Sequence, residues 1–162
     1  MSNHSEVQLK FLADSMLGKL ARWLRMAGFD ADYRKGSDFS AFLRIAREEK
    51  RIVLTRDTKF LKIYSPPEFF FIEDDAVEKQ FRAVATKFRL TVNVDKLCRC
   101  LYCNIPVEAV SRENVYGKVP DYIYDNILHF TKCPACSRIY WEGSHVTKLR
   151  KRLLNAFSKC NI

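Results

Sequence analysis

Hydrophobic residues in the first 90 positions alternate between short continuous runs and longer stretches with helical spacing. The runs have the length and composition of buried strands and lie at 9–13, 29–33, 52–55 and 69–72. The longer stretches repeat apolar residues every three or four positions and lie at 15–27, 39–46 and 77–88. This alternation of strands and helices predicts an α/β fold with a parallel sheet between two layers of helices. Gly28 is expected to end the first helix.

The cysteines divide the chain in two. All six follow residue 97, at Cys98, Cys100, Cys103, Cys133, Cys136 and Cys160. We therefore predict an α/β core over 1–97 and a smaller module over 98–162. Within this module, a strand is expected at 105–110, an insertion at 119–128 and a C-terminal helix at 146–157.

Two CxxC turns predict a metal site in the second part of the chain. Turns of this type wrap a tetrahedral zinc ion, and four thiolates leave no open position for catalysis. The expected ligands of this structural zinc are Cys100, Cys103, Cys133 and Cys136. A bound metal would also stabilise a module whose apolar core is small. Cys98 and Cys160 lie outside both turns and are predicted to be free thiols.

The chain is strongly basic, with 28 lysines and arginines against 19 acidic residues and a net charge of +9. Such a balance favours a polyanionic partner, most simply nucleic acid, although a solvated surface can produce it too. The predicted helix at 146–157 has basic residues and no acid on its polar face, which suits a phosphate backbone. The alternative is that these charges serve solubility alone.

The chain contains no apolar run of the roughly 18 residues that a membrane span requires. Its first residues have neither a basic leader nor the apolar stretch of a secretory signal. We therefore expect a soluble protein in the reducing cytoplasm, where clustered cysteines are more often metal ligands than disulfides.

Acidic residues follow the predicted strands. Asp14 follows the first strand, Asp57 follows the third, and Asp38 lies in the first turn of the second helix, while the fourth strand is followed by Glu73, Asp74 and Asp75. The carboxyl ends of parallel strands share one edge, so these carboxylates would repel each other unless Mg²⁺ or Mn²⁺ neutralised them. Metal-assisted phosphoryl transfer is the chemistry this arrangement suits. Alternatively, each Asp serves a turn or a helix N-terminus.

Cationic residues stand near these acids. Lys19 and Arg22 lie one turn apart on the polar side of the first helix, and Arg56 adjoins Asp57, so all three are candidates for binding substrate phosphates. His145, at a glycine-containing corner before the last helix, could bind phosphate or transfer a proton. The alternative is a solvated helix face for the cations and a structural role for the histidine.

Four sequence blocks resemble those of a known family, the PIN-like RNases named after the C-terminal domain of the exonuclease Mut-seven. They are FLADSMLGKLARWLRMAGFDADY, RIVLTRD, RCLYCN and CPACSRIYWEGSH, in the family's order and over nearly the whole chain. The resemblance implies a PIN-like nuclease core with a fused zinc ribbon that cleaves RNA. It also implies that Asp14, Asp38 and Asp57 bind the catalytic metal and that the two CxxC turns bind zinc.

The chain departs from this family pattern at one position. Lys59 stands where related sequences often have a further Asp, so one metal site would be weaker or would rely on Glu73 or Asp74. We predict a metal-dependent endoribonuclease; the alternative is an adaptor that binds RNA or the ribosome without catalysis, which Lys59 favours. A dehalogenase-type phosphatase is set aside because Met16 occupies the place of its second Asp.

Overall fold

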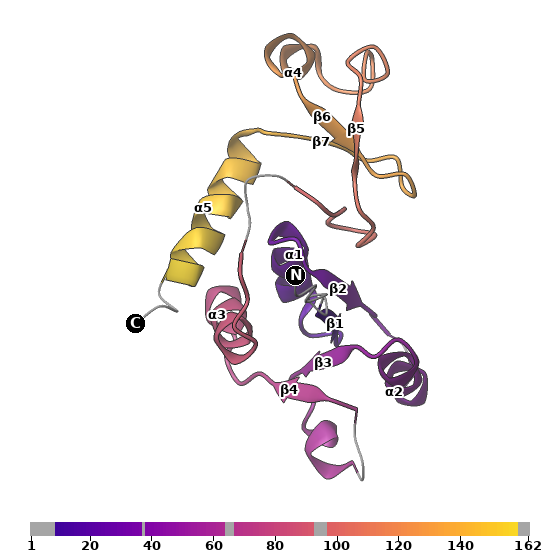
Figure 1. The fold of residues 1–162 in the computed structure, drawn as a ribbon, viewed down its shortest axis with the longest axis vertical. Coiled ribbons are helices and arrows are strands. Elements are labelled where there is room, and N and C mark those ends of the chain that lie inside the picture. The colour runs from indigo at the N-terminus through magenta and orange to yellow at the C-terminus, as the bar shows by residue number, and fades with distance from the viewer. Residues whose placement is uncertain (1–8, 37, 64–66, 93–96, 159–162) are drawn as a thin grey trace, which may run out of the picture.

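The protein contains two sheets, each with its own helices (Figure 1). The computed structural model describes residues 9–36, 38–63, 67–92 and 97–158. The first part comprises β1 (Lys10–Ala13), α1 (Gly18–Met26), β2 (Asp30–Tyr33), α2 (Phe39–Glu48), β3 (Ile52–Thr55), the 3₁₀ helix η1 (Thr58–Lys62), β4 (Phe69–Phe71) and α3 (Val77–Lys87). The second part comprises β5 (Glu108–Val110), α4 (Asp121–Asn126), β6 (Phe130–Lys132), β7 (Ile139–Trp141) and α5 (Ser144–Ser158).

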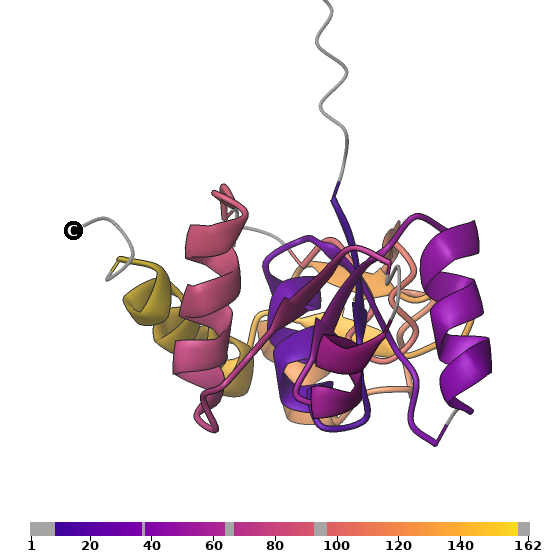
Figure 2. The ribbon, with the colours of Figure 1, turned by 90° about the horizontal axis from the view of Figure 1, so that it is seen from below.

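Strands β1 to β4 form one parallel sheet in the order β2-β1-β3-β4. Helices α1 and α3 lie on one side of this sheet and α2 on the other (Figure 2). The three-layer α/β core predicted from the hydrophobic pattern is therefore confirmed. Because all four strands run the same way, the segments that follow them begin at the same edge of the sheet.

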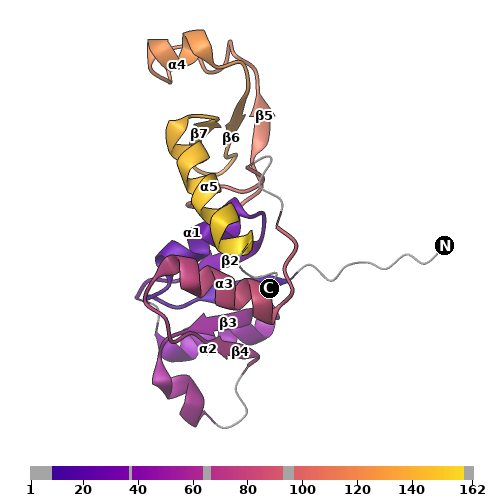
Figure 3. The same ribbon diagram turned by 90° about the vertical axis from the view of Figure 1, so that its left-hand side faces the viewer.

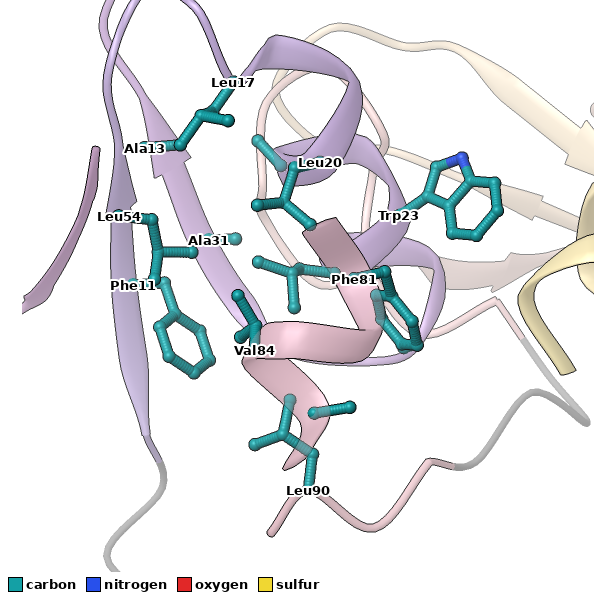
Figure 4. Packing of buried hydrophobic residues seen from close by; sticks show 14 of the residues in the cluster. Phe11, Ala13, Leu17, Leu20, Trp23, Ala31, Leu54, Phe81, Val84 and Leu90 are labelled. Atoms are coloured by element: carbon teal, nitrogen blue, oxygen red, sulfur yellow. The ribbon is translucent and has the colours of Figure 1, made fainter. Parts of the chain in front are cut away.

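The core cluster with the most buried residues lies between the sheet and helices α1 and α3 (Figure 4). Phe11 and Leu54 point from the two central strands toward Leu20 of α1 and Phe81 of α3, and all four are fully buried. Successive strand residues point to opposite faces, so Leu12 packs against α2 on the other side. Burying a side chain of this size stabilises the fold by roughly 1.5–3 kcal/mol.

Helix α1 begins three residues later than the hydrophobic spacing predicts. The Asp14 carboxylate accepts a hydrogen bond from the backbone N–H of Met16, so the chain first makes a turn. Gly18 then packs against the ring of Tyr33, where a Cβ atom would lie 3.0 Å from the nearest ring carbon. The helix ends before Gly28, whose φ of +93° is the left-handed conformation expected there.

The second part consists of the antiparallel sheet β5-β6-β7, which has a small core, and of α5, which follows β7 in the chain and does not pack in that core. Helix α5 lies alongside α3 (Figure 3) and buries Leu153 and Ala156 in the core of the first part. The two sheets thus fall on either side of residues 97 and 98, whereas α5 packs across that boundary. Division into two independently folding domains stays a prediction.

The turn that follows Cys100 covers the free edge of β2. Asn104 accepts a hydrogen bond from the backbone N–H of Ala31 at 3.1 Å and donates one to Asp30 at 2.7 Å. The buried Arg25 donates to the carbonyl of Ala31 at 2.7 Å and to the carbonyls of Leu101 and Tyr102. These two side chains satisfy backbone groups at a sheet edge, which would otherwise be exposed to pairing with another strand.

Asp30 completes this contact. Burial alone would raise its pKa, but the hydrogen bonds from Arg51 and Asn104 outweigh burial and hold the pKa of Asp30 below its ordinary value. The carboxylate is therefore ionised at neutral pH, and the second part of the chain is attached to β2 by charge-assisted hydrogen bonds.

We expect Asn104→Ala to lower the free energy of unfolding by about 2–4 kcal/mol. The substitution removes both hydrogen bonds and places alanine at a φ of +63°, a conformation that asparagine and glycine tolerate better. Unfolding in urea measures the loss. Asn104→Gly, which relieves the backbone but not the lost bonds, should be intermediate, and Asn114→Ala in an exposed loop is the matched control. Equal stability of Asn104→Ala and the unaltered protein would contradict this role.

Candidate active site and four-cysteine centre

A cleft of about 570 Å³ lies where the strands of the parallel sheet end. Its lining includes Asp14, directly after β1, Asp57, two residues after β3, and Asp38, directly before α2. The three aspartates singled out in the sequence are therefore brought to one cavity from segments far apart in the chain. We call it the aspartate cleft.

Asp14 is the most firmly held of the three. The residue is only 8% exposed, and its carboxylate accepts three hydrogen bonds. The backbone N–H of Met16 donates at 2.8 Å, and the Thr55 hydroxyl and the backbone N–H of Arg56 each donate at 2.7 Å. Three donors on a buried carboxylate fix its orientation and compensate for the water it has lost.

Thr55, the last residue of β3, links two of the aspartates. Its hydroxyl is fully buried; it donates to Asp14 and accepts a 2.9 Å hydrogen bond from the backbone N–H of Asp57. The Asp57 carboxylate in turn accepts from the backbone N–H of Lys59 at 2.9 Å and begins η1. A single buried hydroxyl thus bridges the Asp14 carboxylate and the backbone of Asp57.

Asp38 is the N-cap of α2. One of its oxygens accepts from the backbone N–H groups of Ser40 at 3.1 Å and Ala41 at 3.3 Å. This is the capping role that the sequence left open as the alternative for this residue. Capping engages one carboxylate oxygen of Asp38, and no hydrogen bond between described residues involves the other.

No positive side chain neutralises these carboxylates. Across the part of the chain that the structure describes, none of the ion pairs includes Asp14, Asp38 or Asp57. Two cationic residues of the cleft lining are engaged in other ion pairs: Arg34 pairs with Asp32 at 2.8 Å, and Arg56 pairs with Asp75. The third, Lys59, has its ammonium over the ring of Phe39, 6.0 Å from the centroid. Carboxylate oxygens without a cationic partner are the donors that Mg²⁺ and Mn²⁺ prefer.

The aspartates share the cleft but do not converge on one point. Among the described residues, only four cysteines form a group of three or more potential ligands whose atoms all lie within 4.8 Å of one another. At least one pair of aspartate oxygens is therefore farther apart than that. The donor types suit a hard cation, whereas the spacing does not match direct ligation of a single ion by all three side chains.

The predicted substrate-binding cations are distributed over two places. Arg56 lines the cleft, with its guanidinium turned to Asp75 and the carbonyl of Glu73. Lys19 and Arg22 are exposed on α1 outside the cleft lining, and Arg22 lies over the ring of Tyr102, 4.7 Å from its centroid. His145 lies in the first turn of α5, but its side chain is outside the described part of the structure.

The sequence analysis did not identify Arg34 or Lys59 as cations of the site. Both line the cleft, although Lys59 had been noted only as the absence of an acid. Arg34 directly follows β2 just as Asp14 directly follows β1, so its place at a strand end was the available signal. Neither Glu73 nor Asp74 lines this cleft; Asp74 borders a second cavity beside α3.

The two CxxC turns bring four sulfurs together with the same backbone geometry. The N–H of Cys100 donates to the carbonyl of Ile105, and that of Cys133 donates to the carbonyl of Arg138. In both turns the N–H of the second cysteine points at the sulfur of the first, at 3.3 Å and 3.5 Å. Cys100, Cys103, Cys133 and Cys136 form this four-cysteine centre, which is consistent with a zinc site.

The cysteines of the centre differ in pKa. Hydrogen bonds from the backbone and guanidinium of Arg138 lower the pKa of Cys136 to about 6, whereas contact with the Cys136 sulfur is the main factor that raises the pKa of Cys103 to about 12. Crowded thiols cannot all ionise without a cation, and a soft divalent ion removes that conflict. Cys98 is exposed and outside this centre; Cys160 is outside the described residues.

Asp38→Asn separates capping from a catalytic role. Asparagine caps a helix about as well as aspartate, so the free energy of unfolding should change by less than about 0.5 kcal/mol. Loss of the charge should lower RNA cleavage by about a hundredfold if the carboxylate holds a catalytic cation. Urea unfolding and cleavage rates measured side by side test both parts. Asp38→Ala should lose stability as well, and full cleavage by Asp38→Asn would leave the residue a cap alone.

Comparison with known protein families matches residues 9–153 to the family described as the Mut7-C RNAse domain. No curated protein and no solved structure matches the chain. Within the described ranges, no helix has the length and apolar character needed to cross a membrane.

Proposed function

Because the chain belongs to the Mut7-C RNAse domain family, we propose that it is a metal-dependent endoribonuclease that hydrolyses RNA phosphodiester bonds in the aspartate cleft. Family membership indicates a ribonuclease. The observation that carries the proposal is the cleft itself, which lies at the carboxyl edge of a parallel sheet and is lined by three aspartates that form no ion pair with any described residue.

In this proposal Asp14, Asp38 and Asp57 hold Mg²⁺ or Mn²⁺. A divalent cation there would supply the charge that screens the phosphate and acidifies a water molecule for attack on phosphorus. Asp14 is kept in place by its three donors, and Thr55 keeps Asp57 in register with it. Since the acids are too widely spaced for one ion to contact all three directly, we propose two ions or a water-mediated contact.

Substrate phosphates would bind to the cations of the cleft lining. Arg34, Arg56 and Lys59 are placed there, and Arg56 would exchange its exposed partner Asp75 for a phosphate. Lys19, Arg22 and His145 would contact RNA outside the cleft. Counterion release then requires that affinity for RNA fall steeply as salt concentration rises.

The four-cysteine centre would bind one structural zinc ion and support RNA contacts by the second part of the chain. Two of the cations of α5 are already paired, Arg150 with Glu142 and Arg152 with Glu78, which leaves Lys148 and Lys151 exposed for this purpose. Reduced cysteines fit a cytoplasmic protein, where we place it. The boundary at 97 and 98 would separate a nuclease core from this ribbon.

The proposal is tested by incubating the purified protein and single-stranded RNA with Mn²⁺ or Mg²⁺. We expect internal cleavage that requires one of these ions. Because water attacks the phosphorus, the 2′-hydroxyl is not the nucleophile, so RNA with 2′-O-methyl groups should still be cut and no 2′,3′-cyclic phosphate should form. Cleavage without divalent ions, or cyclic phosphate products, would contradict this mechanism.

A second candidate is an adaptor that binds RNA or the ribosome without cutting. The presence of three cations in the cleft lining, Arg34, Arg56 and Lys59, favours it, because their charge could balance that of the aspartates. An adaptor should bind RNA equally well with or without Asp14→Asn and leave it intact under all ionic conditions.

A further inference from the structure

An aromatic ring and two guanidinium groups form an exposed contact between α1 and the first cysteine turn. Tyr102 is 53% exposed. The central carbon of the Arg22 guanidinium lies 4.7 Å from the centroid of its ring, and that of Arg138 lies 3.8 Å away. We call these three residues the Tyr102 stack. They come from three separate segments: α1, the first CxxC turn and the residues just after the second.

This stack is not needed to attach the cysteine turn to the core. The attachment is made by Arg25, which donates to the carbonyls of Leu101 and Tyr102, and by Asn104, which bonds to β2. Both side chains are buried, so their hydrogen bonds are the strong and fixed part of the contact. The Tyr102 ring and its two arginines remain at the surface.

The arginines of the stack have no carboxylate partners. Within the residues that the structure describes, neither Arg22 nor Arg138 pairs with a carboxylate. Arg138 instead contacts the sulfur of Cys136. Two exposed guanidinium groups beside a tyrosine ring offer both a phosphate contact and a flat surface of the kind on which nucleic acid bases stack.

Exposed residues lie between the aspartate cleft and the stack. Met16 lines the cleft and is 63% exposed, and Lys19 and Arg22 follow it at intervals of three residues. Lys19 and Arg22 are neighbours on one face of α1, about 4.5 Å apart along the helix axis. These residues therefore lead from the cleft along α1 to Tyr102.

We propose that the Tyr102 stack binds an unpaired base of single-stranded RNA whose backbone runs from the aspartate cleft along α1. The choice of RNA as the ligand rests on the proposed function, whereas the stacking surface rests on the contacts above. Bound in this way, the substrate is single-stranded on the side of the cleft that faces the cysteine centre, because a base in a duplex is not free to stack on a side chain.

Binding by cleavage-deficient protein tests this proposal. The probes are fluorescein-labelled oligouridine and an abasic oligomer of equal length, measured by anisotropy in Asp57→Asn protein without added Mg²⁺ or Mn²⁺. We expect Tyr102→Leu to weaken oligouridine binding roughly tenfold and to leave binding of the abasic oligomer unchanged. Arg22→Gln should weaken both probes and lower the salt dependence by about one phosphate contact. Tyr122→Leu, at a tyrosine 74% exposed on α4, is the matched control.

Unchanged oligouridine binding by Tyr102→Leu would overturn the proposal, as would an equal loss for both probes. Thermal unfolding and zinc content show whether the variant is folded. If it is not, photocross-linking of the parent protein to 4-thiouridine RNA decides: the cross-linked peptide should contain Tyr102, and cross-links confined to other peptides would refute the proposal. If Tyr102 contributes to oligouridine binding but the protein does not cleave RNA, only the nuclease function is refuted. If the protein cleaves RNA but Tyr102 does not contribute to binding, only the role of the Tyr102 stack is refuted.

Discussion

Asp57→Asn is expected to lower the rate of RNA cleavage by at least about a thousandfold. The substitution keeps the shape of the side chain, and its amide oxygen can still accept the hydrogen bond from the backbone N–H of Lys59. The buried hydroxyl of Thr55 also keeps its bond to the backbone of residue 57. What is lost is one negative charge of the cleft and, with it, the ability to hold a divalent cation.

The measurement is the initial rate of cleavage of labelled single-stranded RNA in Mn²⁺, together with affinity for the same RNA and the urea midpoint. Affinity and stability should stay close to those of the unaltered protein. Asp125→Asn, at an exposed position of α4, is the matched control and should cleave normally. Undiminished cleavage by Asp57→Asn would show that the reaction does not take place in the aspartate cleft.

Cys133→Ser is expected to abolish zinc binding and to unfold the second part of the chain. Cys133 is fully buried within the four-cysteine centre, and serine offers no thiolate to a soft ion. Structural zinc sites in small modules contribute on the order of 10 kcal/mol to folding, more than the small core of Val115, Val119 and Phe130 can replace.

This loss should extend to the first part of the chain. The first cysteine turn carries Asn104, which bonds to Ala31 and Asp30 of β2, so its disorder would leave the edge of the parallel sheet uncovered. Zinc content of the purified protein and the thermal unfolding midpoint measure both effects. Cys98→Ser, at an exposed cysteine outside the centre, should keep one zinc per chain. One zinc ion per chain in Cys133→Ser would contradict the assignment of this residue as a ligand.

Local patterns in the sequence predicted most of the fold because they depend on neighbouring residues alone. The run at 52–55 became β3 with the predicted bounds, and Gly28 adopts the left-handed conformation that ends a helix. Alternation of strands with helices then leaves few topologies open, since parallel strands need a crossover between them. The start of α1 was displaced because the side chain of Asp14 and the contact between Gly18 and Tyr33 decided it.

The candidate site was predicted in its residue types and only partly in its geometry. A strand that ends in an acid indicates which carboxylates reach the sheet edge, and Asp14, Asp38 and Asp57 do line one cleft. The residues next to a long side chain in sequence do not determine the direction in which it points. Arg56 lines the cleft, but its guanidinium turns to Asp75. Arg22 lies over the ring of Tyr102, outside the cleft lining.

By itself, the sequence determined the parallel α/β core and the four cysteines able to hold a metal, because both follow from short-range spacing along the chain. It offered the three aspartates as candidates, through their places near strand ends and through the family resemblance. Only the tertiary structure decided that Asn104 covers the β2 edge, that α5 returns to bury Leu153 in the first core, and how far apart the aspartates lie. These features join residues that are distant in sequence, 73 positions apart for Asn104 and Ala31, and such contacts exist only once the chain has folded.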